Sequence, residues 1–190
     1  MTRLSRFIHV GILLGIALLL MAPVTETSKQ AGSGTSSLYM SVKGQKQGDI
    51  KGGLTQKGLE NFIDVDAWSH EIVSPRDAAS GLPTGKRQHK PITITKRIDK
   101  ATPKLYSALT QNENLVSVEL RFYRTSAKTG ANELYFTVKL ENANIASINN
   151  STDQTSGGEI EMVSFTYQKI TWTWMDGGIT ATDDWETPVV

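Results

Sequence analysis

Asp64 and Asp66 stand two residues apart in the stretch Ile63–Ile72. Alternate residues of a β-strand face the same side of a sheet, so both carboxylates would share one face. Paired carboxylates can bind a divalent cation or take part in acid–base catalysis. The pair alone does not define a site, and a solvated or interface strand face is the interpretation that we adopt.

The histidines are the next candidates for chemistry. His70 or His89 could join a serine and an aspartate in a hydrolase triad. The chain has no G-x-S-x-G nucleophile elbow, and neither histidine lies in a recognisable catalytic motif. The chain also has no cysteine, which excludes disulfides, thiol catalysis and acylation of a cysteine. We therefore expect surface or hydrogen-bonding histidines, no enzyme activity, no metal site and no cofactor.

A basic run, Lys86-Arg87-Gln88-His89-Lys90, lies in a stretch rich in proline and glycine, Ser74–Lys90. Such a run can bind anions or nucleic acids. The formal net charge is only +1 and no aromatic residues alternate with the basic ones, so we expect no nucleic-acid partner. The stretch is predicted to form a long exposed loop, with Lys86, Arg87 and Lys90 as candidate contacts to other subunits.

Three tryptophans in the C-terminal part could form a carbohydrate platform, because aromatic rings stack on sugars. Trp172 and Trp174 share one face of a predicted strand with Ile170, which favours a core position for both. Trp185 lies instead in the acidic segment TDDWETP. An isolated tryptophan there is expected to pack into a pocket of its own chain or of a neighbour.

The elements that position these residues begin with Ile92–Leu109. Its first part alternates Ile92, Ile94 and Ile98 with polar residues, which predicts a strand. Thr102 is then a suitable N-cap and Pro103 a suitable first residue for a short helix that ends near Leu109.

The rest of the chain is typical of β-structure. Further strands are predicted at Leu38–Lys43, Phe62–Ile72, Val116–Tyr123, Leu134–Leu140, Ala143–Ile148 and Val163–Trp174. In the last of these the apolar phase changes around Gln168–Lys169, which predicts a β-bulge. The fold class is mainly β: an antiparallel β-barrel or sandwich with one short α-helix.

The first 36 residues differ from the rest. Met1–Ala22 has two arginines and then an apolar run, the plan of a secretory signal peptide, followed by a polar linker to about Ser37. No A-x-A cleavage pattern occurs there. We therefore divide the 190 residues into a signal-like leader with its linker, 1–36, and one folded domain, 37–190.

Four segments carry a resemblance to a known family: LYMSVKG with the following GD, IDVDAWSHEI, ITKRIDKATPKL and SFTYQKITWTWMDGGITATDDWE. In this order and spacing they are similar to the Hcp family, the tube proteins of bacterial type VI secretion systems. The resemblance implies hexameric rings that stack into an inner tube, without catalytic chemistry. It also implies identical subunits, a spike protein of the VgrG type, a contractile sheath and small effectors as partners.

The resemblance also suggests particular roles. If Trp68 packs inward, Ser69 points to the tube lumen, where it is our candidate effector contact; an inert surface serine is the alternative. Hcp-like tubes assemble in the cytoplasm and leave by contraction, whereas the leader of this chain is typical of export. The start codon could lie further downstream, the leader could be used, or it could be an uncleaved anchor that holds a periplasmic form.

The alternative function is an exported periplasmic binding module, a β-sandwich of the lectin kind. Such a module would be a monomer with exposed, clustered tryptophans. A small hydrolase is disfavoured because no catalytic constellation occurs in the sequence.

Overall fold

The structure is a computed structural model that describes residues 36–153 and 157–187. All of these belong to one compact unit, Gly34–Val190. The leader predicted at 1–36 lies outside the described residues except for its last position. In the described part of the chain, no helix combines the length and the apolar character that a membrane crossing requires.

The described elements are, in chain order, β1 (Ser37–Gly44), β2 (Gly48–Ile50), β3 (Ile63–Val65), β4 (Ala67–Ser69), β5 (Ile72–Val73), β6 (Gln88–His89), β7 (Ile92–Arg97), α1 (Thr102–Thr110), β8 (Leu115–Thr125), β9 (Asn132–Asp153), β10 (Gly158–Trp174) and β11 (Ile179–Asp184). All strand pairs are antiparallel. The predicted class, mainly antiparallel β with one short helix, is confirmed.

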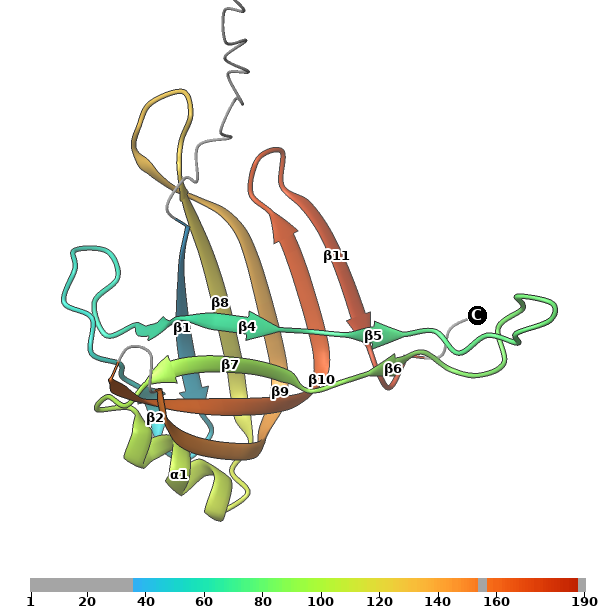
Figure 1. Cartoon of the computed structure of the whole chain (residues 1–190), viewed down its shortest axis with the longest axis horizontal. Helices are drawn as coiled ribbons and strands as arrows, with labels where there is room; N and C mark the ends of the chain where they lie inside the picture. The colour runs from blue at the N-terminus through green and yellow to red at the C-terminus, as the bar shows by residue number, and fades with distance from the viewer. Residues whose placement is uncertain (1–35, 154–156, 188–190) are drawn as a thin grey trace, which may run out of the picture. The chain divides into compact units, whose positions relative to one another are not determined.

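One large sheet contains every strand except β5 and β6. Its hydrogen-bonded order is β2-β1-β8-β9-β10-β7-β4, with β3 also on β1 and β11 on β10. Figure 1 shows β1, β8, β9 and β11 lying roughly along one axis and β4 and β7 crossing them. β3 pairs with β1 and β4 pairs with β7, and only Asp66 separates β3 from β4. The hydrogen-bonded path is thus open, and one short stretch of chain connects its two ends.

The long strands β9 and β10 link the two groups of strands, because β9 pairs with β8 and β10 pairs with β7. Leu134–Leu140 and Ala143–Ile148, predicted as separate strands, are parts of one long β9. Asn142 has a left-handed backbone (φ 49°), and its side chain donates a hydrogen bond to Gln168 Oε1 (2.8 Å). The predicted bulge at Gln168 is wrong: the ladder keeps its register there and shifts instead between Ser164 and Phe165. The alternation of apolar residues changes phase at Gln168 because β9 and β10 both switch, at the same level of the hairpin, the side that faces the core.

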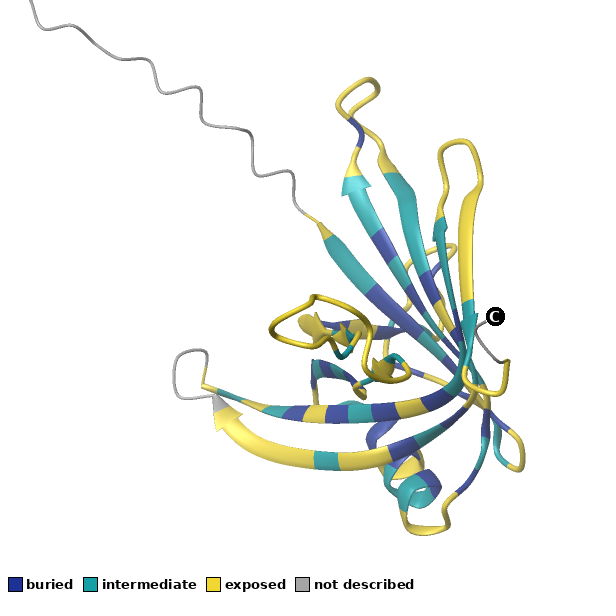
Figure 2. Ribbon diagram, turned by 90° about the vertical axis from the view of Figure 1, so that its right-hand side faces the viewer, coloured by how far each residue is buried: buried dark blue, intermediate teal, exposed yellow. Residues whose placement is uncertain are grey.

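The core lies on the inner face of this sheet, and Figure 2 shows buried and exposed residues alternating along its strands. Side chains without exposed surface include Met40, Ile94, Leu120, Val163 and Phe165. Helix α1 adds Leu105 and Ala108 to the same cluster. Each of these strands therefore has one apolar and one polar face, as an antiparallel sheet permits.

Three local predictions are corrected. The helix cap is Ala101 without a side-chain hydrogen bond, while Thr102 is buried and its hydroxyl accepts from the Asp99 N–H (3.2 Å). The predicted strand Val116–Tyr123 begins with Val116 in the apolar phase of Val118 and Leu120. Val116 is instead 43% exposed, because the ladder with β1 passes over it and pairs Gly44 with the buried Leu115. Trp174 is also exposed, since it lies where β10 ends and turns towards β11.

Candidate functional site at the base of the loop

The loop of residues 71–90 is built as a separate unit. β5 and β6 pair only with each other, and Arg76 bridges to Pro83 further out. Leu82 is 65% exposed, and almost all residues of the loop are exposed, which confirms the predicted excursion. Figure 1 shows the loop extending beyond β11.

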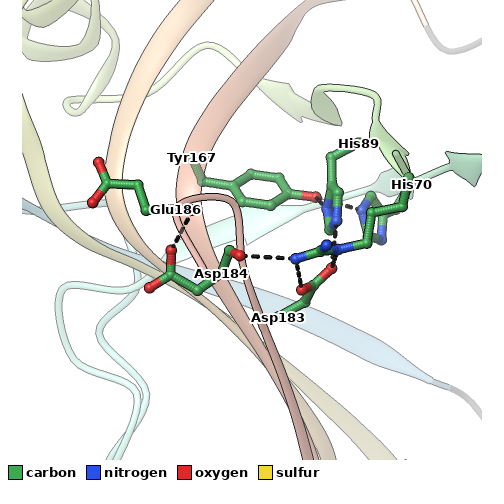
Figure 3. Close-up of polar contacts among 7 residues, drawn as sticks. His70, His89, Tyr167, Asp183, Asp184 and Glu186 are labelled. Carbon is green, nitrogen blue, oxygen red and sulfur yellow. Dashed lines mark hydrogen bonds and ion pairs between the residues drawn. The ribbon is translucent and has the colours of Figure 1, made fainter. Parts of the chain in front are cut away.

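A chain of polar side chains lies at the base of this loop (Figure 3). His70 Nε2 and His89 Nδ1 each lie 2.8 Å from the hydroxyl oxygen of Tyr167, which comes from β10. His89 Nε2 lies 2.7 Å from Asp183 Oδ2 on β11. Arg87 donates two hydrogen bonds to the same carboxylate and a third to the Asp184 carbonyl (2.8 Å). We call His70, Arg87, His89, Tyr167 and Asp183 the anchor network.

The contacts determine where the protons lie when both rings are neutral. An ionised carboxylate only accepts, so His89 must donate from Nε2 to Asp183 and accept at Nδ1. The Tyr167 hydroxyl therefore donates to His89 Nδ1 and accepts from His70 Nε2. The proton assignment is an inference from the hydrogen-bond partners. Each of these three contacts then joins one donor to one acceptor.

The local electrostatics support this assignment. Burial would raise the pKa of Asp183, but its hydrogen bonds from Arg87 and His89 outweigh burial and lower that pKa. Burial, followed by the charge of His89, lowers the pKa of His70. Burial and the negative charge of Asp183 raise the pKa of Tyr167. An ionised aspartate, a neutral His70 and a protonated tyrosine are thus favoured together.

Aromatic rings surround the network. Trp68 and Trp172 stack on His70 with centroid distances of 6.4 and 6.1 Å, and Trp185 lies 5.2 Å from His89. Trp185 keeps 46% of its surface exposed and lines a hollow of about 240 Å³ beside Tyr167 and Lys90. The predicted packing of Trp185 in its own chain is thus partly present.

The network resembles a triad in its Asp183–His89 pair but not in its third member. The histidine faces a tyrosine hydroxyl whose pKa is raised, and a hydroxyl that keeps its proton is a poor nucleophile. Among residues 36–153 and 157–187, no group of three or more histidine or acidic residues could hold a metal ion. The anchor network can hold the loop against the sheet, and the charge of the network can change with pH.

Asp64 and Asp66 are both exposed, which fits the solvated interpretation. Burial, then the charge of Asp66, raises the pKa of Asp64. The two carboxylates therefore interact, as the predicted shared face requires.

A second polar cluster lies inside the domain. Lys96 Nζ is 2.8 Å from Glu161 Oε1, and neither side chain has exposed surface. Lys96 also donates to the Arg97 carbonyl (2.8 Å), to Asp99 (2.8 Å) and to the Thr102 hydroxyl (3.1 Å). No hydrogen-bond donor is aligned with either Glu161 oxygen in the described structure, so the close contact acts as an ion pair. Lys96 thereby joins β7, β10 and the start of α1.

Ser69 lies on the exposed face of the sheet. Trp68 packs its ring on Phe122 (5.0 Å) but stays 37% exposed, so it is only partly inward. Ser69 starts a row of hydroxyls across four strands, whose cross-strand neighbours are Thr93, Ser164 and Ser147. The next row consists of Ala67, Thr95, Met162 and Asn149. Neither row contains a charged residue.

The predicted contact residues of the loop have different environments. Lys86 and Lys90 are exposed, whereas Arg87 is engaged with Asp183 of its own chain. Tyr167, Asp183, Lys96 and Glu161 were not identified from the sequence as polar-cluster residues. Two of them could have been found from the sequence, because each is a charged residue at a position where the alternation predicts an apolar one. Lys96 continues the series Ile92 and Ile94, and Glu161 begins the series Val163 and Phe165.

Comparison with known proteins adds to this geometry. A family model described as "Type VI secretion system effector, Hcp" matches residues 39–174. The "Major exported protein" of Pseudomonas aeruginosa is 45% identical over 166 residues, which cover 80% of this chain and 96% of that protein.

Solved structures agree with this relationship. A mutant form of the Hcp1 protein from E. coli EAEC 042 pathovar is 36% identical with a TM-score of 0.72, and the match covers 78% of this chain and 98% of that one. The secreted protein Hcp3 from Pseudomonas aeruginosa is 38% identical with a TM-score of 0.69, over 80% of this chain and 100% of that one. The chain belongs to the Hcp family of type VI secretion system proteins.

Proposed function

We propose that this chain is a structural subunit of a type VI secretion inner tube. In this function it forms hexameric rings that stack, are secreted and carry small effectors in the lumen, and it performs no catalysis. The name of its exported relative and its membership of the Hcp family support secretion. Assembly in the cytoplasm, a VgrG-type spike, a contractile sheath and effectors as partners belong to the same proposal.

The observation that carries the proposal is the two uncharged rows described above, which cross β4, β7, β10 and β9 on their exposed face. Ser69, Thr93 and Ser164 lie side by side on it, and Thr93 hydrogen bonds to Ser164 (2.8 Å). The opposite face of the same strands carries Ile94 and Val163, both without exposed surface. Small hydroxyl groups bind water and offer hydrogen bonds without selecting a charge. Such a face is suited to line a wet channel for different cargo proteins.

The sheet also offers edges that a neighbouring subunit could cover. β11 pairs only with β10, so one edge of it is open in the described structure. Ile179 at its start is 69% exposed, next to the exposed Met175 and Trp174. Open strand edges with apolar neighbours are protected in natural proteins by pairing or covering. A closed ring would cover them by contacts between two different patches of adjacent subunits.

Native mass spectrometry with negative-stain imaging tests the proposal. We would compare the full chain with the piece Ser37–Val190, which contains every described strand. A species of six subunits with a central hole supports the tube. A monomer for both chains at concentrations up to the millimolar range would contradict it and favour the exported binding module.

Replacing Ser69 tests the lumen assignment. Ser69→Glu places a charge at the β4 end of the uncharged hydroxyl row, so we expect intact rings that retain less effector in co-purification. Gln56→Glu, at an exposed position outside this face and outside the loop, is the control for one added negative charge elsewhere. Wild-type effector retention by the Ser69 variant would show that this face does not contact cargo.

Replacing Trp185 tests the role of the C-terminal segment. Trp185→Ala removes the ring that covers His89, and we expect weaker folding or weaker ring assembly. Thermal unfolding and the mass of the assembled species measure the two effects separately. Unchanged values of both would show that Trp185 has neither role.

A further inference from the structure

The loop of residues 71–90 is held to the domain by side chains. Its described backbone hydrogen bonds stay inside the loop: β5 pairs with β6, Asp77 with Leu82, and Lys90 N–H with the Glu71 carbonyl. The two-stranded sheet of β5 and β6 makes no ladder with the large sheet. The contacts that cross to β10 and β11 are those of the anchor network and the stack of Trp172 on His70, and the ring of Trp185 lies against His89.

These crossing contacts contain two titratable rings. His70 lies at one end of the loop and His89 at the other, with ring centroids 6.5 Å apart. The groups facing them are Tyr167 from β10, Asp183 from β11 and Arg87 from the loop itself, with Asp184 beside Arg87. Asp183 is the carboxylate that contacts His89, and Arg87 already forms an ion pair with it.

We propose that the anchor network is a pH-sensitive latch that holds residues 71–90 against β10 and β11 at neutral pH and loosens them in mild acid. The latch acts within one chain, and it does not depend on the tube function proposed above. It determines how firmly the exposed loop is oriented for any contact that the loop makes.

Proton counting explains the direction. One added proton can be accommodated, because His89 can donate from both nitrogens while Tyr167 turns its hydroxyl towards His70. With a second proton both rings donate to the Tyr167 oxygen, and its own O–H loses its acceptor. Three positive groups, Arg87 and two imidazolium rings, then face the carboxylate of Asp183, with only that of Asp184 beside Arg87 in addition. A partly buried site with this excess of positive charge favours release of His70 to water.

The direction in which the pKa of His70 is shifted agrees with loosening in acid. Burial and His89 lower it from 6.5, so the neutral ring is favoured in the folded chain. The stabilisation from this group is present above about pH 6.5 and is lost as the pH falls through the lowered folded-state pKa. Asp183 has a lowered pKa and stays ionised in this range, so Arg87 keeps its end of the loop attached. We therefore expect loosening to start on the His70 side.

Hydrogen exchange of the full chain at pH 7.5 and 5.5, corrected for intrinsic rates, tests the latch. We expect a several-fold loss of protection for amides of residues 71–74 at pH 5.5, with little change in β8. His70→Gln keeps an N–H that can reach Tyr167 but does not titrate, so its loop should stay protected at both pH values. The monomeric and assembled fractions are measured separately, because the expected response is a property of one chain.

The variant Tyr167→Phe provides a second test of the latch in the same hydrogen-exchange experiment. It removes the central hydroxyl and keeps the ring, so loop protection at pH 7.5 should already match that of the wild type at pH 5.5. Tyr106→Phe on α1 removes a hydroxyl outside the network and serves as the control. Equal loop protection of the wild type at both pH values, or an undiminished pH response of His70→Gln, would overturn the latch. These two results stand even where the Tyr167 variant does not fold.

Discussion

Among the described residues, the Lys96 cluster and the anchor network use ion pairs in different ways. The Lys96–Glu161 pair has no exposed surface and joins β7, β10 and the start of α1. The anchor network joins the loop to β10 and β11, and its ion pair of Arg87 and Asp183 is about one-fifth exposed. The first cluster holds the core together, and the second holds a projecting loop to it.

The difference shows how burial and group type decide what a polar contact does. Two charges without solvent access stabilise a fold only when they remain together, because either one alone would be a buried charge. The anchor network instead contains imidazole rings, which change charge near neutral pH. A loop that is held by such groups can change its attachment without affecting the core.

The largest effect is expected for Lys96→Met. It leaves Glu161 without its cation among buried residues, and breaking a buried pair in this way costs about 3–5 kcal/mol of unfolding free energy. Denaturant unfolding at one fixed protein concentration measures it, since assembly would also shift the midpoint.

The double variant Lys96→Met/Glu161→Leu is the matched control. Removing both charges and keeping similar volumes should recover most of the lost stability. If the single variant unfolds at the wild-type midpoint, the contrast between the two clusters is wrong. If the double variant is as unstable as the single one, the hydrogen bonds of Lys96 to Asp99 and Thr102 matter more than the pair.

The two clusters also differ in how far the sequence could predict them. Alternation of apolar residues identified most strands, and the same alternation places Lys96 and Glu161 on buried faces. Their pairing depends on the register of β7 against β10, which alternation does not contain. The anchor network is further from prediction, because its members come from separate segments and have no common spacing.

The strand pattern predicted the fold class, and the stretch rich in proline and glycine predicted the exposed loop, but neither predicted these side-chain contacts. Trp174 shows the limit of alternation: it has the phase of Ile170, yet the sheet ends around it and leaves it exposed. Arg87 shows another limit. A basic run in a loop indicates an exposed charge, whereas the partner of Arg87 is supplied by β11, far along the chain.

A smaller effect is expected when the pH is lowered from 7.5 to 5.5. The lowered pKa of His70 means that wild-type stability should fall over this range, and His70→Gln should remove most of the fall. The lowered pKa of Asp183 makes its contribution disappear only below this range. Denaturant midpoints of both proteins at the two pH values measure the difference. An equal fall in both proteins would place the sensitivity in other groups.

The smallest effect is expected for an exposed ion pair. Arg124 and Glu133 lie 2.8 Å apart, but their side chains are 43% and 39% exposed. Water and salt screen such a pair, so Glu133→Gln should leave the unfolding midpoint unchanged within error. Arg124→Ala should cost more, because Arg124 also lies over the rings of Tyr135 (4.9 Å) and Trp174 (5.4 Å). If Glu133→Gln were as destabilising as Lys96→Met, burial would not be the property that separates the two clusters. Position in the sheet would then be the better explanation, since the Arg124 pair joins neighbouring strands just as the Lys96 pair does.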